Sequence, residues 1–146
     1  MILSAGRIAV QSGLANANAR WCHVNYQTFE STAAKDVHVI GDAIQIAPAM
    51  PKSGHMANSQ AKVCADAIIR AFNGEAPDPN PVTSSACFSP ITATTAAWLT
   101  ASFQYDPTTR AMKRVEASFA EAPGPTSDGM QQMFHWADNI FADSFS

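Results

Sequence analysis

The sequence predicts an α+β fold, in which a strand and a helix are followed by an antiparallel hairpin sheet packed with a C-terminal helix. Three patterns support this prediction. The apolar run 37–40 ends at a glycine, as a short buried strand does. Apolar residues recur at helical spacing over 55–73, and apolar and polar residues alternate with a period of two over 97–105. Helical and strand periodicities thus occupy separate stretches of the chain, as they do in α+β proteins.

The composition fits a globular chain with one core and at most two lobes. The 146 residues are 47% hydrophobic and only 14% charged, which is not the composition of a disordered chain. A net charge of −3 offers no basic surface for nucleic acid, so we expect no nucleic-acid partner. No apolar run reaches the length of a transmembrane helix.

The first half should contain a short strand pair and one long helix. Residues 28–32 are expected to extend beside the strand at 37–40. One apolar stripe marks the helix: Ala57, Ala61, Cys64, Ile68, Ala71 and Phe72. Gly74 is placed to end this helix, and Pro77 prevents its continuation. Within the stripe we interpret Cys64 as a core residue.

The second half should begin at the proline-rich connector 75–81, which divides the chain into segments 1–76 and 77–146. Residues 84–90 are serine-rich and are expected to be turn-prone. The alternating strand 97–105 should turn at 106–109 and return over 111–119. Thr126 or Ser127 can cap the last helix. Its apolar stripe should cover the sheet or a partner and consists of Met130, Met133, Phe134, Ala137, Ile140 and Phe141.

A candidate ligand site lies where the predicted strand meets Gly41 and Asp42. Glycine lets the backbone approach a ligand, and the aspartate can accept hydrogen bonds from sugar-like hydroxyls. The helix that opens after 50–54 would direct its positive N-terminal end at the same place. The pattern predicts a site for a cofactor rich in hydroxyls and negative charge, although such a Gly-Asp pair more often marks only a turn.

The cysteines and histidines predict no metal site. The three cysteines, Cys22, Cys64 and Cys87, form no Cys-x-x-Cys pair and cannot all be paired in disulfides within the chain. None of the four histidines has a ligand spacing supported by a nearby cysteine or carboxylate.

Five stretches carry a resemblance to a known family: 21–24, 28–32, 38–43 (HVIGDA), 50–54 (MPKSG) and 57–63. With them the chain resembles the C-terminal part of the flavin-binding subunit of flavocytochrome c sulfide dehydrogenase. That subunit is related to sulfide:quinone oxidoreductases within the FAD-dependent pyridine nucleotide-disulfide oxidoreductase superfamily. The resemblance implies that 1–76 is the end of an FAD-binding domain, and that 77–146 is the family's C-terminal flavin-binding and interface domain.

The resemblance also implies roles for individual residues. Gly41 and Asp42, with Ala43 beside them, match the position at which an aspartate holds the ribityl chain of FAD. The loop that leads into the helix whose N-terminus faces the flavin pyrimidine matches Met50, Pro51, Lys52 and Ser53. Lys52 would stabilise negative charge on the reduced flavin, or it is simply a solvated lysine.

Cys87 is the candidate catalytic residue, in the motif Cys87-Phe88-Ser89. In the resembling family this cysteine lies beside the flavin and forms a redox-active disulfide with a cysteine much earlier in the chain. Cys22 and Cys64 do not correspond to that partner, so we expect no complete disulfide cycle here; without the resemblance, a buried free thiol is an equal reading. His55 stands where many relatives carry an aromatic between flavin and haem, and Trp136 lies in the matching C-terminal region.

The implied parent protein is periplasmic, oxidises sulfide as a small sulfur substrate and passes electrons through FAD to a c-type cytochrome subunit. None of the seven glycines forms the Gly-x-Gly-x-x-Gly turn that binds the FAD pyrophosphate. We therefore expect the chain alone to be colourless and inactive and to bind FAD weakly if at all. The start at Met1 carries no secretory signal, and we expect a fragment of a longer protein.

Two alternatives remain open from the sequence. One is a fragment of a sulfide:quinone oxidoreductase, whose C-terminus would contact a membrane through an amphipathic helix. The other is a non-catalytic module that folds alone and pairs with itself or with a cytochrome. Haem or quinone as acceptor, and sulfide or another sulfur compound as donor, are not distinguished by the sequence.

Overall fold

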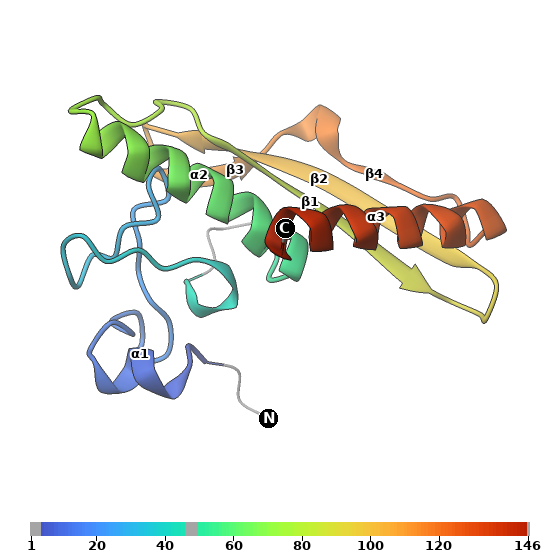
Figure 1. Cartoon of the computed structure of the whole chain (residues 1–146), viewed down its shortest axis with the longest axis horizontal. Coiled ribbons are helices and arrows are strands. Elements are labelled where there is room, and N and C mark those ends of the chain that lie inside the picture. Colours follow the sequence, from blue (N-terminus) through green and yellow to red (C-terminus); the bar gives the residue numbers. More distant parts are fainter. Residues whose placement is uncertain (1–3, 46–49, 146) are drawn as a thin grey trace.

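The computed structural model describes residues 4–45 and 50–145. The expectation about the start of the chain at Met1 falls outside these residues. Three α-helices, two short 3-10 helices and a four-stranded antiparallel sheet, all within the described residues, confirm the α+β class (Figure 1). The helices are α1 (Arg7–Gln11), η1 (Gly41–Ala43), α2 (Gly54–Phe72), η2 (Glu116–Ser118) and α3 (Ser127–Phe145). The strands are β1 (Val82–Pro90), β2 (Ala96–Asp106), β3 (Ala111–Arg114) and β4 (Ala120–Glu121).

The sheet is built around β2, which pairs with β1 on one side and with β3 and β4 on the other. The turn predicted at 106–109 is confirmed, because Asp106 accepts hydrogen bonds from the backbone of Thr108 and the hydroxyl of Thr109. The single return strand predicted over 111–119 is wrong, since β3 ends at Arg114. Ser118 explains the interruption: its hydroxyl accepts the hydrogen bond of the Ser102 amide at 2.8 Å, in place of a backbone partner.

The prediction that 84–90 is turn-prone is wrong, because these residues lie within β1. Its amides alternate between two partners. Some of the β1 amides bond to β2. On the opposite side of the strand, the Ser84 amide donates to Ser59 Oγ at 2.9 Å and the Ala86 amide donates to His55 Nδ1 at 2.7 Å. Two side chains of α2, one turn apart, therefore complete the hydrogen bonding of a serine-rich strand that local propensity does not favour.

Helix α2 forms where it was predicted, but the predicted stripe is wrong in part: the buried face is Met56, Gln60, Cys64 and Ala67, while Phe72 is 88% exposed. Ser53 caps it by accepting from the Met56 amide at 3.2 Å. It ends at Phe72, and Gly74 follows with φ +72° while the Glu75 amide bonds to the Arg70 carbonyl at 2.8 Å. Cys64 is 8% exposed within the apolar stripe, so its reading as a core residue is confirmed.

The strand expected at 37–40 forms no named strand. His38 makes a single antiparallel bridge with Glu30, and the Val39 amide donates to the Phe29 carbonyl at 2.9 Å. The expected pairing of 28–32 with this segment is thus confirmed. A strand needs sustained pairing along its length, and within the described chain these two segments bond only locally.

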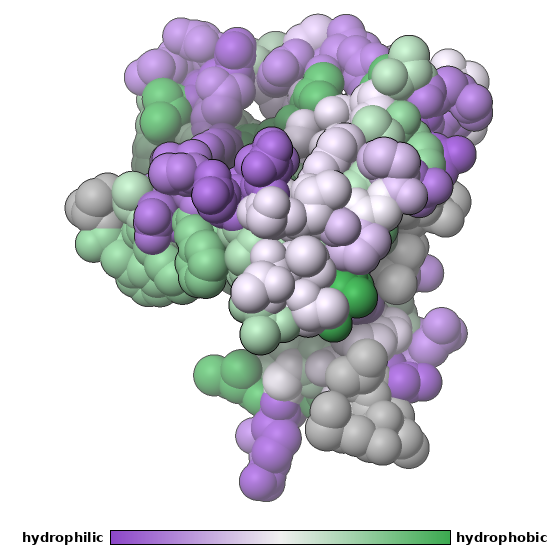
Figure 2. Space-filling model, turned by 90° about the vertical axis from the view of Figure 1, so that its right-hand side faces the viewer, coloured by the Kyte–Doolittle hydropathy of each residue, from purple (hydrophilic) through white to green (hydrophobic). Residues whose placement is uncertain are grey.

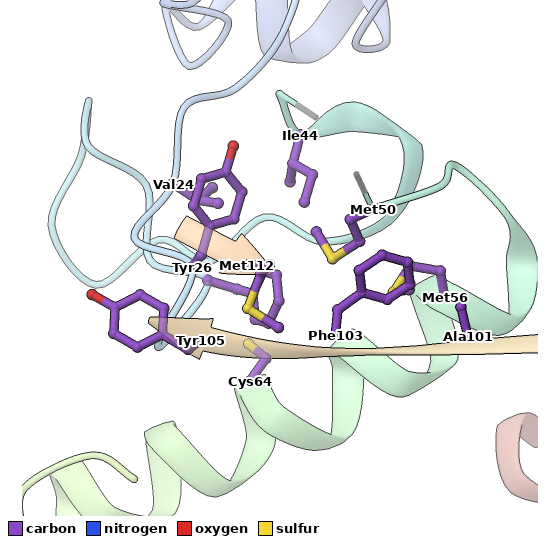
Figure 3. Close-up of a cluster of buried hydrophobic side chains, with 11 residues drawn as sticks. Val24, Tyr26, Ile44, Met50, Met56, Cys64, Ala101, Phe103, Tyr105 and Met112 are labelled. Carbon is purple, nitrogen blue, oxygen red and sulfur yellow. The ribbon is translucent and has the colours of Figure 1, made fainter. Parts of the chain in front are cut away.

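One hydrophobic core joins the two halves of the sequence. Figure 3 shows Val24, Tyr26 and Ile44 from the N-terminal loops facing side chains of α2, β2 and β3. Its other buried members are Phe29, Met50, Met56, Cys64, Ala101, Phe103, Tyr105 and Met112. A smaller cluster of Ala5, Ala9, Ala15 and Cys22 anchors α1.

Helix α3 lies along the β1–β2 hairpin (Figure 1). Its cap is Thr126, whose hydroxyl accepts from the Gly129 amide at 2.9 Å. A Cβ on Gly129 would lie 2.4 Å from the Ala96 carbonyl oxygen, so glycine permits the close approach of helix and strand. The apolar stripe covers the sheet only in part, because Phe134 and Phe141 remain 61% and 60% exposed. Among the described helices, none combines the length and apolar character needed to cross a membrane.

Candidate functional site

The Gly41–Ala43 turn is pressed against α2. Gly41 has φ +70°, which favours glycine, and a Cβ there would meet the Ala57 Cβ at 3.2 Å. The Gly41 amide donates to Gln60 Oε1 at 2.6 Å. Backbone conformation, close packing and one buried side chain therefore fix this turn in place.

Asp42 extends from the turn with its side chain exposed. Within the described part of the chain, no hydrogen bond is made to its carboxylate; its backbone carbonyl accepts from Lys52. A carboxylate without hydrogen bonds from the described residues can accept them from hydroxyls of a ligand.

Lys52 is bound to the loop in which it lies. Its ammonium group donates to the Asp42 carbonyl at 2.6 Å and to the Ile44 carbonyl at 2.7 Å, and it lies 3.8 Å from the centre of the Trp21 ring. Burial lowers the pKa of Lys52, and the Asp42 carboxylate opposes this shift. Because two of its three N–H donors bond to these carbonyls, Lys52 ties the start of α2 to the segment 42–44.

Of the other residues at 50–53, Met50 is buried, while Pro51 and Ser53 lead into α2. Met50 is 3% exposed, and its sulfur accepts weak hydrogen bonds from Gln60 Nε2 and Thr83 Oγ1, both at 3.6 Å. Pro51 is exposed. Ser53 caps α2 and lines the groove beside β1, so the helix begins at that groove.

Cys87 lies at the exposed end of a strand face whose inner members, Thr83 and Ser85, are buried. It borders an apolar groove of about 310 Å³ between the start of α2, β1 and α3. The groove is lined by Ser53, Gly54, His55, Ala86, Cys87, Trp136, Ala137, Ile140 and Phe141. The reading of Cys87 as a buried thiol is wrong. Cys22 and Cys64 are buried and unpaired, and burial raises the pKa of both thiols.

His55 and Trp136 meet beside this groove. The centres of their rings are 6.0 Å apart in an edge-to-face arrangement. The centre of the Phe88 ring lies 5.4 Å from that of Trp136. The indole Nε1 of Trp136 is buried and has no hydrogen-bond partner in the described residues. Figure 2 shows hydrophobic atoms exposed at the left of the view, the side on which α3 lies. The apolar surface of α3 therefore continues the groove outward.

Gln60 was not singled out by the sequence, although it connects the parts of the site. Its amide bonds to Gly41 on one side and to Met50 on the other, and it is 2% exposed. The available signal was its position: Gln60 falls three and four residues from Ala57 and Cys64, where the apolar stripe passes. A polar residue at a core position needs a hydrogen-bond partner.

Within 4–45 and 50–145, no group of three histidine, cysteine or acidic residues is arranged to hold a metal ion. No known family model matches the chain. The assignment of a function therefore depends on the residues and on their arrangement.

Proposed function

We propose that this chain is the C-terminal portion of a flavoprotein subunit of the sulfide dehydrogenase type, and that it forms one wall of a flavin site. One observation carries the proposal. The first turns of α2 contact both the Gly41–Asp42 turn and the groove that the exposed Cys87 borders. Gly41 and Cys87 are 46 positions apart in sequence (87 − 41).

The residues present fit the half of FAD that carries no phosphate. A glycine with no room for a Cβ precedes an exposed aspartate that can accept ribityl hydroxyls. The amides at the start of α2 can bond to the carbonyl oxygens of a flavin ring. When bound, FAD would accept the electron pair removed from the sulfur substrate.

In this proposal each residue has a limited task. Asp42 orients the ribityl chain, and Lys52 holds the loop in the conformation that presents Asp42. The thiol of Cys87 lies at the apolar groove, which is where a small sulfur anion would bind. His55, Phe88 and Trp136 supply an aromatic lining on the side from which a c-type cytochrome would accept electrons.

Riboflavin provides the most direct test, because it has the ring and ribityl chain but no phosphate. We expect a titration followed by ¹H–¹⁵N NMR to shift the amide signals of Gly41, Asp42, Gly54 and Cys87. Asp42→Ala should reduce these shifts, and the matched variant Asp138→Ala, on exposed α3, should not. Shifts that cluster elsewhere, or that Asp42→Ala leaves unchanged, would contradict the proposal.

A second candidate function, a non-catalytic module that pairs with itself or with a cytochrome, is favoured by the exposed apolar side of α3. Phe134, Phe141 and Phe145 are 61%, 60% and 83% exposed. Sedimentation at rising concentration tests self-pairing: a dimer that Phe141→Ser dissociates supports it, and a monomer at all concentrations counts against it.

A further inference from the structure

The structure contains another cavity, which shares no lining residue with the Cys87 groove and lies between the segment 23–32 and the β2–β3 turn. It has a volume of about 450 Å³ and is lined by His23, Val24, Asn25, Gln27, Thr32, Tyr105 and Arg110. None of these side chains is acidic, while guanidinium, imidazole, amide and hydroxyl groups can all donate hydrogen bonds. We propose that this cavity binds a small organic or inorganic oxyanion, through Arg110 and the hydroxyl of Tyr105.

The strongest observation comes from comparing the two tyrosines of the chain. Tyr26 and Tyr105 are each 7% exposed and belong to the same core cluster. Tyr26 donates its hydroxyl hydrogen to the Gln45 carbonyl at 2.8 Å. The Tyr105 hydroxyl has no hydrogen bond within the described residues, and Figure 3 shows it directed away from the cluster. The Tyr105 ring is buried, but its hydroxyl is not among the buried unpaired polar atoms and borders the cavity, so it is accessible there to a ligand.

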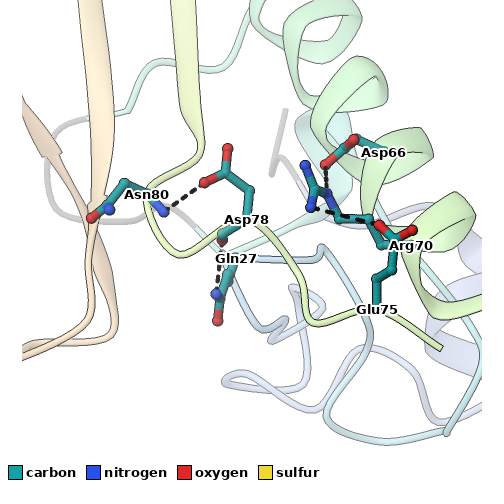
Figure 4. A network of polar contacts seen from close by, with 6 residues as sticks. All are labelled: Gln27, Asp66, Arg70, Glu75, Asp78 and Asn80. Carbon is teal, nitrogen blue, oxygen red and sulfur yellow. Dashed lines mark hydrogen bonds and ion pairs between the residues drawn. The ribbon is translucent and has the colours of Figure 1, made fainter. Parts of the chain in front are cut away.

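Arg110 supplies the positive charge. It lies in the turn between β2 and β3, directly after Asp106-Pro107-Thr108-Thr109, and forms no ion pair with any described carboxylate. The acidic residue of that turn, Asp106, is instead paired with Lys113. Arg70 shows the contrast: it bonds to Asp66 and lies near Glu75 (Figure 4). A free guanidinium fork binds carboxylate, phosphate or sulfate oxygens with two parallel hydrogen bonds.

The remaining lining residues are held in position by the protein. Gln27 donates through Nε2 to the Asp78 carbonyl at 2.8 Å (Figure 4), and Thr32 donates to the His23 carbonyl at 3.1 Å. Asn25 accepts from the Gln27 amide through Oδ1, which leaves its NH₂ group for a ligand. The cavity is therefore preorganised for an acceptor, and its size admits an anion with a short carbon chain. This inference does not depend on the flavin proposal, since riboflavin carries no oxyanion.

The test is a calorimetric titration of the whole 146-residue chain with inorganic phosphate and with succinate, at constant ionic strength in chloride. We expect one site with a dissociation constant on the order of 1 mM for at least one of the two. The stronger binder identifies a phosphate-type or a carboxylate ligand. Arg110→Gln and Tyr105→Phe should each weaken binding roughly tenfold, because each removes a hydrogen bond to a charged group.

Tyr26→Phe is the matched control. It should lower the melting temperature by about 2–4 °C, since a buried hydrogen bond is lost, and leave anion affinity within about twofold of the original. Tyr105→Phe should weaken anion binding but leave stability nearly unchanged. Without anion its melting temperature stays within about 2 °C of the original. The proposal is overturned if neither anion binds below about 100 mM, if Tyr105→Phe and Arg110→Gln bind like the original chain, or if Tyr26→Phe weakens binding equally.

Discussion

Gln60 offers the sharpest test of how the candidate flavin turn is held in place. Its side chain is 2% exposed, and the 2.6 Å bond from the Gly41 amide is the contact that fixes the turn to α2. Gln60→Leu keeps the size of the side chain and the helix propensity but removes the acceptor. The Gly41 amide would then lose its partner, while the sulfur of Met50 would keep the hydroxyl of Thr83.

The magnitude follows from the burial of these groups. A buried donor left unsatisfied costs about 1–3 kcal/mol, and Gly41 is only half-buried, so water can reach its amide in part. We therefore expect Gln60→Leu to lower the free energy of unfolding by about 1–2 kcal/mol. For a chain of this length, that corresponds to a fall in melting temperature of about 2–8 °C.

Urea denaturation measures the change, and hydrogen exchange of the Gly41 amide measures its cause. Gln132→Leu, an exposed glutamine on the other 19-residue helix, is the matched control and should change stability by less than about 0.5 kcal/mol. The reasoning fails if Gln60→Leu is as stable as the original chain, or if the Gly41 amide exchanges at its original rate in the variant.

Two further predictions concern titratable groups. Iodoacetamide should label Cys87 well before Cys22 and Cys64, because Cys87 is exposed while burial shields the other two thiols and raises the pKa of both. Mass spectrometry of tryptic peptides after timed labelling measures the three rates. Equal rates for the three cysteines would refute the prediction. Hydrogen bonds from Lys113, from the Thr108 amide and from the Thr109 hydroxyl lower the pKa of Asp106. This group therefore contributes stability above the pKa of an unfolded aspartate, about 3.9, and loses it as the pH falls further. Acid unfolding of Asp106→Asn should lack that contribution, and identical acid profiles for the two chains would contradict it.

The long periodic elements could be predicted from the sequence, because their signals are local. The helix α2 with Gly74 as its stop and the β2 alternation with its Asp106 turn needed only spacing and turn chemistry, whereas the face that α2 buries was predicted correctly only at Cys64. Strand β1 could not be predicted in this way. Ser84 and Ser85 favour turns by themselves, and the strand exists because α2 and β2 provide hydrogen-bond partners that are distant in sequence.

The candidate site was predicted unevenly for the same reason. Gly41 and Asp42 could be found from their order in the chain, and the positive φ at Gly41 agrees with the residue type. The roles of Lys52 and Met50 depend on carbonyls and side chains that become neighbours only after folding. Tyr105 is the extreme case, since its alternating pattern marks it as core while its hydroxyl opens into a cavity that no local signal reveals.

The hydrogen bonds from β1 to Ser59 and His55 have a consequence for association between molecules. A strand at the border of a sheet normally presents free amides on which a strand of another molecule can assemble. Here the amides of Ser84 and Ala86 are occupied, and β1 ends at Pro90, which has no amide hydrogen to offer. Another chain can extend the sheet along these residues only after the first turns of α2 have moved away. Helix α2, which packs against the Gly41–Ala43 turn, thus also protects this part of the β1 border from pairing with a strand of another molecule.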